Sequence, residues 1–258
     1  MKSLWNSFKI AFSMFSKIPM PQAEWSKENM KYMFLFFPWI GIVIGAVVYG
    51  AAYVGIKCGF DTAFVNIVVL LIPVLITGGI HVDGLLDTSD AMSSWQTRER
   101  RLEILKDSNA GAFAVITAVV YFLLWYAACS QIHLNLEVLA ILGLGFILSR
   151  TLSGLGVLLI PKAKADGTVA EFSKKSENVA VRNVLLLYLA ALLAGMFLLH
   201  PLLGSLTFLM ALLVFFYYYH MAMKYFGGTT GDLSGAFLCV CELAMALTLA
   251  VGANFIRM

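Results

Sequence analysis

Charged side chains are scarce in this chain of 258 residues, where they make up 13% of the sequence against 60% hydrophobic residues. Soluble globular domains carry about 25% charged residues, so the composition excludes an ordinary soluble protein and indicates an integral membrane protein. The net charge of +3 comes with no basic cluster interleaved with aromatic residues. Nucleic acid is therefore not expected as a partner.

Several other features are also absent. The four cysteines include no C-x-x-C pair, because one residue separates Cys239 from Cys241, and we interpret all four as small apolar side chains. We find no signal peptide, low-complexity tract, repeat of fixed period or polar linker long enough to separate two domains. We therefore expect residues 1–258 to form a single integral membrane domain.

Seven long apolar stretches are present, and most of them reach the ~20 residues that a helix needs to cross a bilayer. Because the hydrocarbon offers no water to backbone groups, these spans are predicted to be helices. The predicted fold class is all-α, a polytopic transmembrane helix bundle of about seven spans, of which the fifth is short. The stretches are 34–56, 62–80, 112–129, 138–160, 184–199, 202–223 and 236–256.

The start of the chain, residues 4–15, is predicted to form an interfacial helix. Its apolar residues recur at helical spacing with lysines between and around them, a pattern typical of a helix that lies on a membrane surface. These apolar residues are Leu4, Trp5, Phe8, Phe12 and Phe15.

Basic residues are concentrated on one side of the predicted spans. Five lysines precede the first span and four basic residues lie in 98–106, whereas the opposite side offers Lys57 and Arg257. The positive-inside rule makes the basic side cytoplasmic. That side also carries Asp83, Asp87 and Asp90, the loop 161–182 and the glycine-rich residues 227–232, so we expect cytoplasmic active-site loops.

Three aspartates, Asp83, Asp87 and Asp90, directly follow the second apolar stretch. In a helix, spacings of four and three residues place all three carboxylates on one face, where a cation or a proton relieves their repulsion. Hard oxygen ligands suit Mg²⁺ or Mn²⁺, and Mg²⁺ usually keeps positions for water and substrate phosphates. The alternative is a solvated helix end that binds no metal.

Other polar residues extend the candidate site. His81 is a candidate general base, general acid or phosphate contact, or else a helix-end histidine bonded to a carbonyl group. Residues 98–107 read as an amphipathic surface helix, and Lys106 and Asp107 at its end are candidate phosphate and metal contacts. Positive-inside flanking explains most of the basic charge in this segment.

The run Gly227-Gly228-Thr229-Thr230-Gly231-Asp232 lets backbone N–H groups approach a phosphate closely. The alternative is an interhelical turn capped by Asp232.

Two charged residues lie inside predicted spans, where each needs a partner or a cavity. Glu242 is a candidate site residue or proton relay. Arg150 either pairs with Glu242 for structural reasons or meets an anionic substrate, and the sequence leaves both options open.

The runs His81-Val82-Asp83-Gly84-Leu85-Leu86-Asp87-Thr88-Ser89-Asp90 and Glu99-Arg100-Arg101-Leu102-Glu103-Ile104-Leu105-Lys106-Asp107-Ser108 resemble the cobalamin synthase family, the adenosylcobinamide-GDP ribazoletransferases. The resemblance extends to residues 18–21, 36–41 and 227–232 and covers nearly the whole chain in order. Four positions depart from the expected pattern, and none of them removes a ligand. They are Leu86, Ser89, Ala91 and Ala114.

The resemblance implies an Mg²⁺-dependent phosphotransferase of the inner (cytoplasmic) membrane that completes the nucleotide loop of vitamin B12. The hydroxyl of α-ribazole, or of its 5′-phosphate, would attack the cobinamide-side phosphorus of adenosylcobinamide-GDP, giving adenosylcobalamin or its 5′-phosphate and GMP. The implied partners are these substrates, membrane lipids and, as an open option, further copies of the chain.

The resemblance also implies roles for particular residues. The implied catalytic residues are His81, Asp83 and Asp87, with the identity of the proton acceptor open. The implied metal ligands are Asp83, Asp87, Asp90 and Asp232. The implied substrate-binding residues are Arg100 or Arg101 and Lys106. The candidates Asp107, Arg150 and Gly228 come from the sequence pattern itself, and we add them to the predicted substrate-binding set.

Two other functions are compatible with parts of the sequence. In a cation- or proton-coupled transporter, Glu242, Arg150 and the aspartates would form a translocation path, but most acids lie on one side and the outward loops are nearly bare. A lipid-forming CDP-alcohol phosphotransferase shares Asp83-Gly84. That family needs an Ala-Arg pair where Asp87 follows Leu86, and its later G-x3-D-x3-D is missing here.

Overall fold

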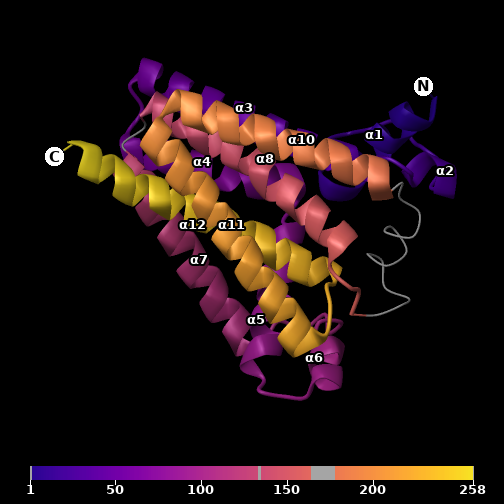
Figure 1. Cartoon of the computed structure of the whole chain (residues 1–258). Helices are drawn as coiled ribbons and strands as arrows, with labels where there is room; N and C mark the ends of the chain where they lie inside the picture. Colours follow the sequence, from indigo (N-terminus) through magenta and orange to yellow (C-terminus); the bar gives the residue numbers. More distant parts are fainter. Residues whose placement is uncertain (1, 133–134, 164–177, 258) are drawn as a thin grey trace.

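A computed structural model describes residues 2–132, 135–163 and 178–257. In these ranges the chain is helical, and the single β feature is an isolated parallel bridge between Lys162 and Thr229. The structure confirms the predicted all-α class (Figure 1). The helices are α1 (Lys2–Phe15), α2 (Lys27–Met30), α3 (Met33–Cys58), α4 (Thr62–Thr77), α5 (Ile80–Ser93), α6 (Arg98–Ile104), α7 (Ala112–Ile132), α8 (Leu136–Leu159), α10 (Asn178–Leu199), α11 (Pro201–Met221), the π-helical η1 (Ala222–Phe226) and α12 (Gly231–Arg257).

Six helical segments in the described ranges are long and apolar enough to cross a membrane, namely α3, α7, α8, α10, α11 with η1, and α12. The predicted second span, 62–80, differs from the expectation of one straight helix. It ends at Thr77, and α4 meets α5 at 91°. Gly78 and Gly79 both adopt positive φ, 67° and 80°, a conformation that interrupts a helix and that glycine adopts without strain. The α4–α5 pair is a broken seventh span or a re-entrant segment.

The centre of the bundle is α8, the most enclosed of the six spans, which packs against α3, α10, α11 and α12. Close approach of α3 to α8 depends on glycine. A Cβ atom on Gly41 would lie 2.4 Å from the carbonyl oxygen of Phe146, and one on Gly45 would lie 2.7 Å from that of Gly143. Small residues four apart let two membrane helices touch through their backbones.

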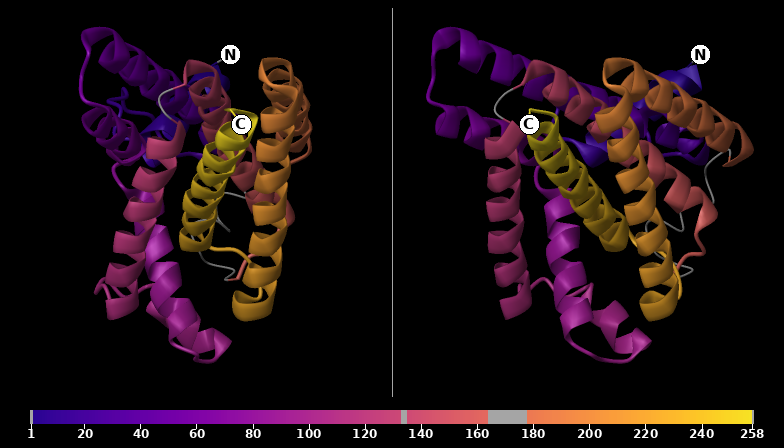
Figure 2. Two further views of the ribbon diagram at one scale, coloured as in Figure 1. Left: turned by 90° about the vertical axis from the view of Figure 1, so that its left-hand side faces the viewer. Right: turned by 60° about the vertical axis from the view of Figure 1, so that its left-hand side comes forward.

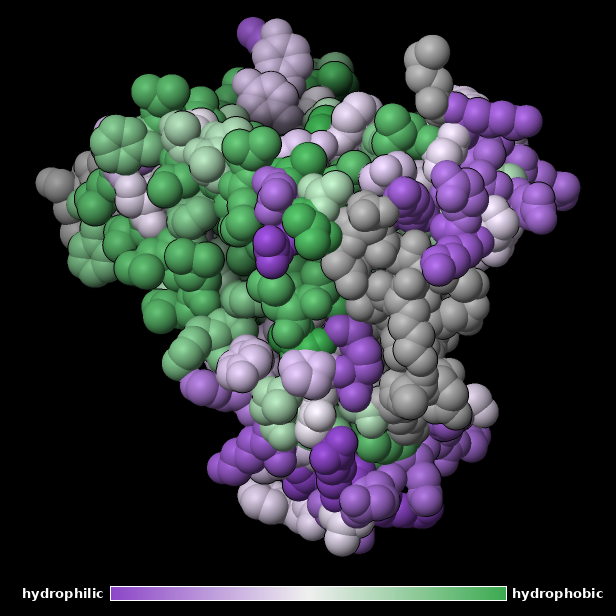
Figure 3. Space-filling model, turned by 45° about the vertical axis from the view of Figure 1, so that its right-hand side comes forward, coloured by the Kyte–Doolittle hydropathy of each residue, from purple (hydrophilic) through white to green (hydrophobic). Residues whose placement is uncertain are grey.

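The outer surface is apolar over the long helices. Leu75, Leu123, Leu187 and Leu198 are 63–81% exposed, which is typical of side chains that contact lipid rather than water. Figure 3 shows hydrophobic residues across one side of the molecule and hydrophilic residues gathered at its lower end and upper right. The chain is therefore a multi-pass membrane protein.

The N-terminal helix is present as predicted. Ile10, Ala11 and Phe12 of α1 are buried and α1 packs on α3, whereas Leu4 and Trp5 are exposed. Its position at the membrane surface stays a prediction.

Candidate active site at the contact between α5 and α12

The three aspartates lie on α5, which is a helix as predicted. The glycine turn at 78–79 changes the direction of the chain between α4 and α5. Helix α5 then packs against α7 and α12, and both views of Figure 2 show these three helices together. The last span begins at Gly231, five residues before the predicted start at 236, so that Asp232 falls in the first turn of α12.

The backbones of α5 and α12 touch at two glycines. A Cβ atom on Gly84 would lie 2.6 Å from the carbonyl oxygen of Asp232 and 2.9 Å from its Cα. A Cβ atom on Gly235 would lie 3.2 Å from the Cα of His81. Because Gly84 lies between Asp83 and Asp87, this contact brings the start of α12 beside both of these aspartates.

Negative charge accumulates at this contact. The carboxyl group of Asp87 experiences the charges of Asp83, Asp232 and Asp90. Carboxylates held together in this way suit a hard divalent cation such as Mg²⁺. Among the described residues, no three His, Cys, Asp or Glu side chains are arranged to enclose an ion by themselves. Mg²⁺ held by these aspartates would need water or substrate oxygens to complete its coordination, and metal binding stays a prediction.

Asp90 also has a structural role. Its two carboxylate oxygens accept hydrogen bonds from the backbone N–H groups of Gly111, at 2.6 Å, and Ala114, at 2.9 Å. These N–H groups lie at the start of α7 and have no partner within that helix. Asp90 thus joins α5 to α7, and its predicted role as a metal ligand stays a prediction.

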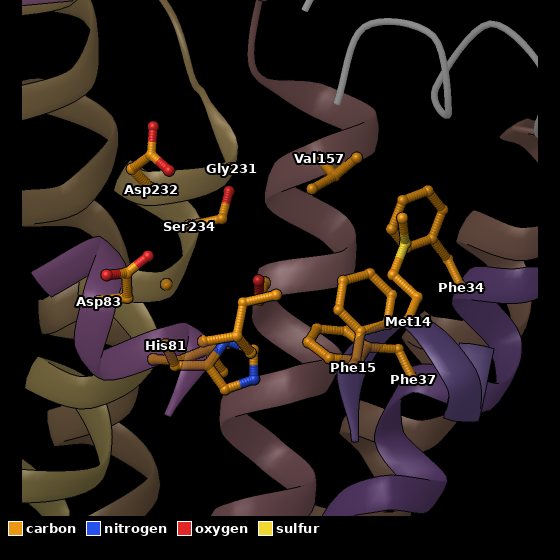
Figure 4. A pocket seen from close by; sticks show the side chains of 14 residues that line it. Met14, Phe15, Phe34, Phe37, His81, Asp83, Val157, Gly231, Asp232 and Ser234 are labelled. Atoms are coloured by element: carbon orange, nitrogen blue, oxygen red, sulfur yellow. The ribbon is translucent and has the colours of Figure 1, made fainter. Parts of the chain in front are cut away.

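A pocket of about 240 Å³ opens beside the aspartates. Figure 4 shows Asp83, Asp232 and Ser234 on one side of it and the side chains of Phe15, Phe34, Phe37 and Met14 on the other, with His81 between the two groups.

His81 is only 8% exposed. Its Nε2 atom is buried and has no hydrogen-bond partner in the described part of the chain. The ring of Phe37 contacts the imidazole edge to face, with 6.1 Å between centroids. Within the described residues no carbonyl group therefore engages Nε2, and the role of His81 in proton transfer stays a prediction.

The basic residues of α6 differ in their surroundings, and none of them lines the pocket in Figure 4. Arg100 is exposed and pairs with Glu103 at 2.7 Å. Arg101 is buried, and its guanidinium group lies 4.8 Å from the ring centroid of Tyr225. The predicted contacts of both arginines with substrate stay predictions.

Lys106 and Asp107 follow α6 and are exposed. The backbone and side-chain N–H groups of Asn109 donate hydrogen bonds to Asp107, which holds the pKa of its carboxyl group below the ordinary value. Asp107 therefore stays ionised near neutral pH, as a metal or cation contact requires. The structure does not bring either residue to the wall of the pocket, and their binding roles stay predictions.

The glycine-rich segment is a tightly packed turn. The N–H groups of Gly227 and Gly228 donate to the carbonyl oxygens of Met223 and Ala222, at 3.2 and 3.1 Å. A Cβ atom on Gly228, whose φ is 154°, would lie 2.4 Å from the carbonyl oxygen of Pro161. Close packing already requires glycine here, and the predicted contact of Gly228 with a phosphate stays a prediction. Most of the predicted loop 161–182 lies outside the described residues.

Arg150 and Glu242 form a buried ion pair, which is the structural option of the two that the sequence left open for Arg150. Arg150 Nη1 lies 2.6 Å from Glu242 Oε1, and the hydroxyl of Ser149 donates to the same oxygen at 2.8 Å. Arg150 is close enough to His81 for the two groups to interact electrostatically. The ion pair accounts for both intramembrane charges, and a further contact of Arg150 with substrate stays a prediction.

Sequence reasoning missed the apolar side of the pocket. Met14, Phe15 and Phe34 read as ordinary residues of an interfacial helix and a membrane span. The signal that was present is the resemblance at residues 36–41, which includes Phe37.

The fold and the site define a class, that of multi-pass helical membrane proteins with a carboxylate cluster beside a pocket. Residues 7–250 match the family model described as cobalamin-5-phosphate synthase. The chain belongs to this family.

Individual relatives are similar over nearly their whole length. The chain is 43% identical to a protein of Lachnoclostridium phytofermentans over 251 residues, 97% of this chain and 95% of the relative. It is 32% identical to a protein of Desulfitobacterium hafniense, with 96% of each chain covered, and 30% identical to one of Clostridium perfringens, with 97% and 100% covered. All three relatives are named adenosylcobinamide-GDP ribazoletransferase. No solved structure matches the chain.

Proposed function

We propose that the chain is an adenosylcobinamide-GDP ribazoletransferase, which transfers adenosylcobinamide phosphate from adenosylcobinamide-GDP to α-ribazole or its 5′-phosphate. The observation that carries this proposal is the family match over residues 7–250. The carboxylate cluster beside a pocket supplies the kind of site that such a phosphoryl transfer needs.

The reaction forms one bond and breaks one bond at the same phosphorus. A ribose hydroxyl oxygen of the acceptor bonds to the cobinamide-side phosphorus, and the bond from that phosphorus to the bridging diphosphate oxygen breaks. The bridging oxygen leaves with GMP, and the hydroxyl proton passes to a base. Phosphoryl transfer depends mainly on positioning and on neutralising charge, which is what residues at the contact between α5 and α12 are suited to do.

Asp83, Asp87 and Asp232 are the residues that would hold Mg²⁺. When bound, Mg²⁺ would neutralise charge on the diphosphate and on the departing GMP. Without a cation, carboxylates gathered at one helix contact would repel both one another and the anionic substrate.

His81 and Asp83 are the candidates for accepting the hydroxyl proton. Both line the pocket, and the buried Nε2 of His81 has no other partner in the described residues.

The site is proposed to face the cytoplasm, in the inner membrane. The support is the concentration of lysine and arginine in the segments on the same side of the spans as α5. Soluble nucleotide substrates would reach the pocket from that side.

The test is a GMP-release assay on detergent-purified protein given adenosylcobinamide-GDP, α-ribazole and Mg²⁺. We expect release by the wild type and a loss of at least 100-fold in Asp83→Asn. The matched control is Asp61→Asn, because Asp61 caps α4 in the loop after α3 and asparagine caps a helix about as well. Wild-type protein that releases no GMP, but moves cations across vesicle membranes, would establish the transporter instead.

A further inference from the structure

The pocket beside Asp83 has two chemically different sides. Met14 and Phe15 from α1 and Phe34 and Phe37 from α3 make an apolar wall (Figure 4). The rings of Phe15 and Phe37 are in contact, with 4.4 Å between centroids. The ring of Phe37 in turn contacts His81, so an aromatic surface leads directly to the polar side.

The polar groups of the pocket are gathered at its other end. Asp83, Asp232 and Ser234 lie there (Figure 4), and Ser153 and Val157 of α8 also line the pocket. A ligand that fills this pocket therefore needs a flat apolar part for the aromatic wall and a hydroxyl-bearing part for the carboxylates.

The size and polarity of the pocket indicate which part of the two proposed substrates it can bind. A pocket of about 240 Å³ has room for a bicyclic base. Guanine carries N–H and C=O groups along its edge that need hydrogen-bond partners, and the carboxylates at the polar end of the pocket are the ones proposed to hold Mg²⁺. Dimethylbenzimidazole, the base of α-ribazole, presents methyl groups and an aromatic face, which stack favourably on phenylalanine rings.

A second hollow suits the other substrate. Its polar lining consists of Ser13, Ser16, Lys17 and the glycine turn at 78–79, and it shares Met14, Ile80 and Asp83 with the first pocket. The ammonium group and hydroxyls of this hollow favour an anionic group such as the donor diphosphate. Asp83 thus lines both hollows.

We propose that the pocket walled by Met14, Phe15, Phe34 and Phe37 binds the benzimidazole base of the acceptor and directs its ribose hydroxyl towards Asp83 and Asp232. This inference rests on the proposed function and adds to it the site of the acceptor.

The experiment compares Phe15→Ala with Phe8→Ala. Both residues belong to α1 and are partly buried, but Phe8 packs against Trp5, Phe36 and Trp39 rather than lining the pocket. The dissociation constant for α-ribazole is measured by equilibrium dialysis without donor, and the KM of each substrate is measured in the full reaction. Phe15→Leu keeps the apolar volume without the ring, and thermal unfolding in the same detergent monitors folding.

Loss of a stacking partner weakens base binding by about fivefold or more. We expect this increase in the dissociation constant and KM for α-ribazole in Phe15→Ala, a smaller increase in Phe15→Leu, and an unchanged KM for adenosylcobinamide-GDP. Phe8→Ala should leave the three values at those of the wild type.

The outcomes separate the two proposals. Unchanged α-ribazole binding in stably folded Phe15 variants, or an increase confined to the KM of the donor, would overturn the acceptor site while leaving the proposed function in place. Wild-type protein that binds α-ribazole through Phe15 but forms no product would support the pocket and contradict the proposed function.

Discussion

The contact between Gly84 and Asp232 sets how far apart the carboxylates of α5 and α12 lie, and Gly84→Ala tests its importance. The added methyl would lie 2.6 Å from the Asp232 carbonyl oxygen, whereas ordinary van der Waals contact begins at 3.4 Å. Because the neighbouring atoms belong to the backbone of Asp232, the two helices must separate by about 0.8 Å to relieve the overlap. That shift moves Asp232 away from Asp83 and Asp87.

A misplacement of about 1 Å at a reaction centre reduces the rate by about 100-fold, and we expect a loss of that order in GMP release by Gly84→Ala. Overpacking should also destabilise the protein by about 1–3 kcal/mol. The control is Gly50→Ala in α3, where the added methyl meets nothing within 4 Å and alanine improves helix propensity. The assay is the GMP-release rate at saturating substrate, with the melting temperature measured in the same detergent. A folded Gly84→Ala protein with the wild-type rate would refute the argument that this contact positions the carboxylates.

Three further predictions concern the charges of the bundle. Arg150→Met or Glu242→Gln alone should destabilise the protein by about 3–5 kcal/mol, because each leaves a buried charge unpaired. The double variant should lose much less stability than the sum of the two single variants. Denaturation in mixed micelles measures the three losses, and additive losses would contradict a coupled ion pair. Asp90→Ala should lower the free energy of unfolding by about 1 kcal/mol, because α7 loses its cap. Hydrogen exchange of the backbone N–H groups of Gly111 and Ala114 should become faster, and an unchanged exchange rate would argue against the cap. EDTA should abolish GMP release, and added Mg²⁺ or Mn²⁺ should restore it; full activity in chelator would contradict the metal site.

Much of the fold followed from local sequence properties. Apolar length identified the spans, and aspartate spacing identified one helix that carries all three carboxylates. The 91° bend between α4 and α5 was missed because apolar length alone does not register the two positive-φ glycines at its centre. The early start of α12 was missed because Gly231 and Asp232 lower the local hydropathy.

The candidate site depended on contacts between distant segments. Asp90 shares a helix face with Asp83 and Asp87, but its oxygens are bonded to the start of α7, more than twenty residues away. Arg150 and Glu242, 92 residues apart, had two open interpretations until their separation was known. The aromatic wall follows from the packing of α1 on α3, which no periodicity in either segment specifies.

The central claim is that this chain transfers the cobinamide-side phosphoryl group to α-ribazole, and following that phosphorus atom tests it most directly. Adenosylcobinamide-GDP radiolabelled at the cobinamide-side phosphorus is incubated with purified protein, Mg²⁺ and α-ribazole, and the products are separated. The account predicts label in the cobalamin product and unlabelled GMP, both lost in Asp83→Asn. Label appearing in the nucleotide or in inorganic phosphate, with no labelled cobalamin formed, would contradict it.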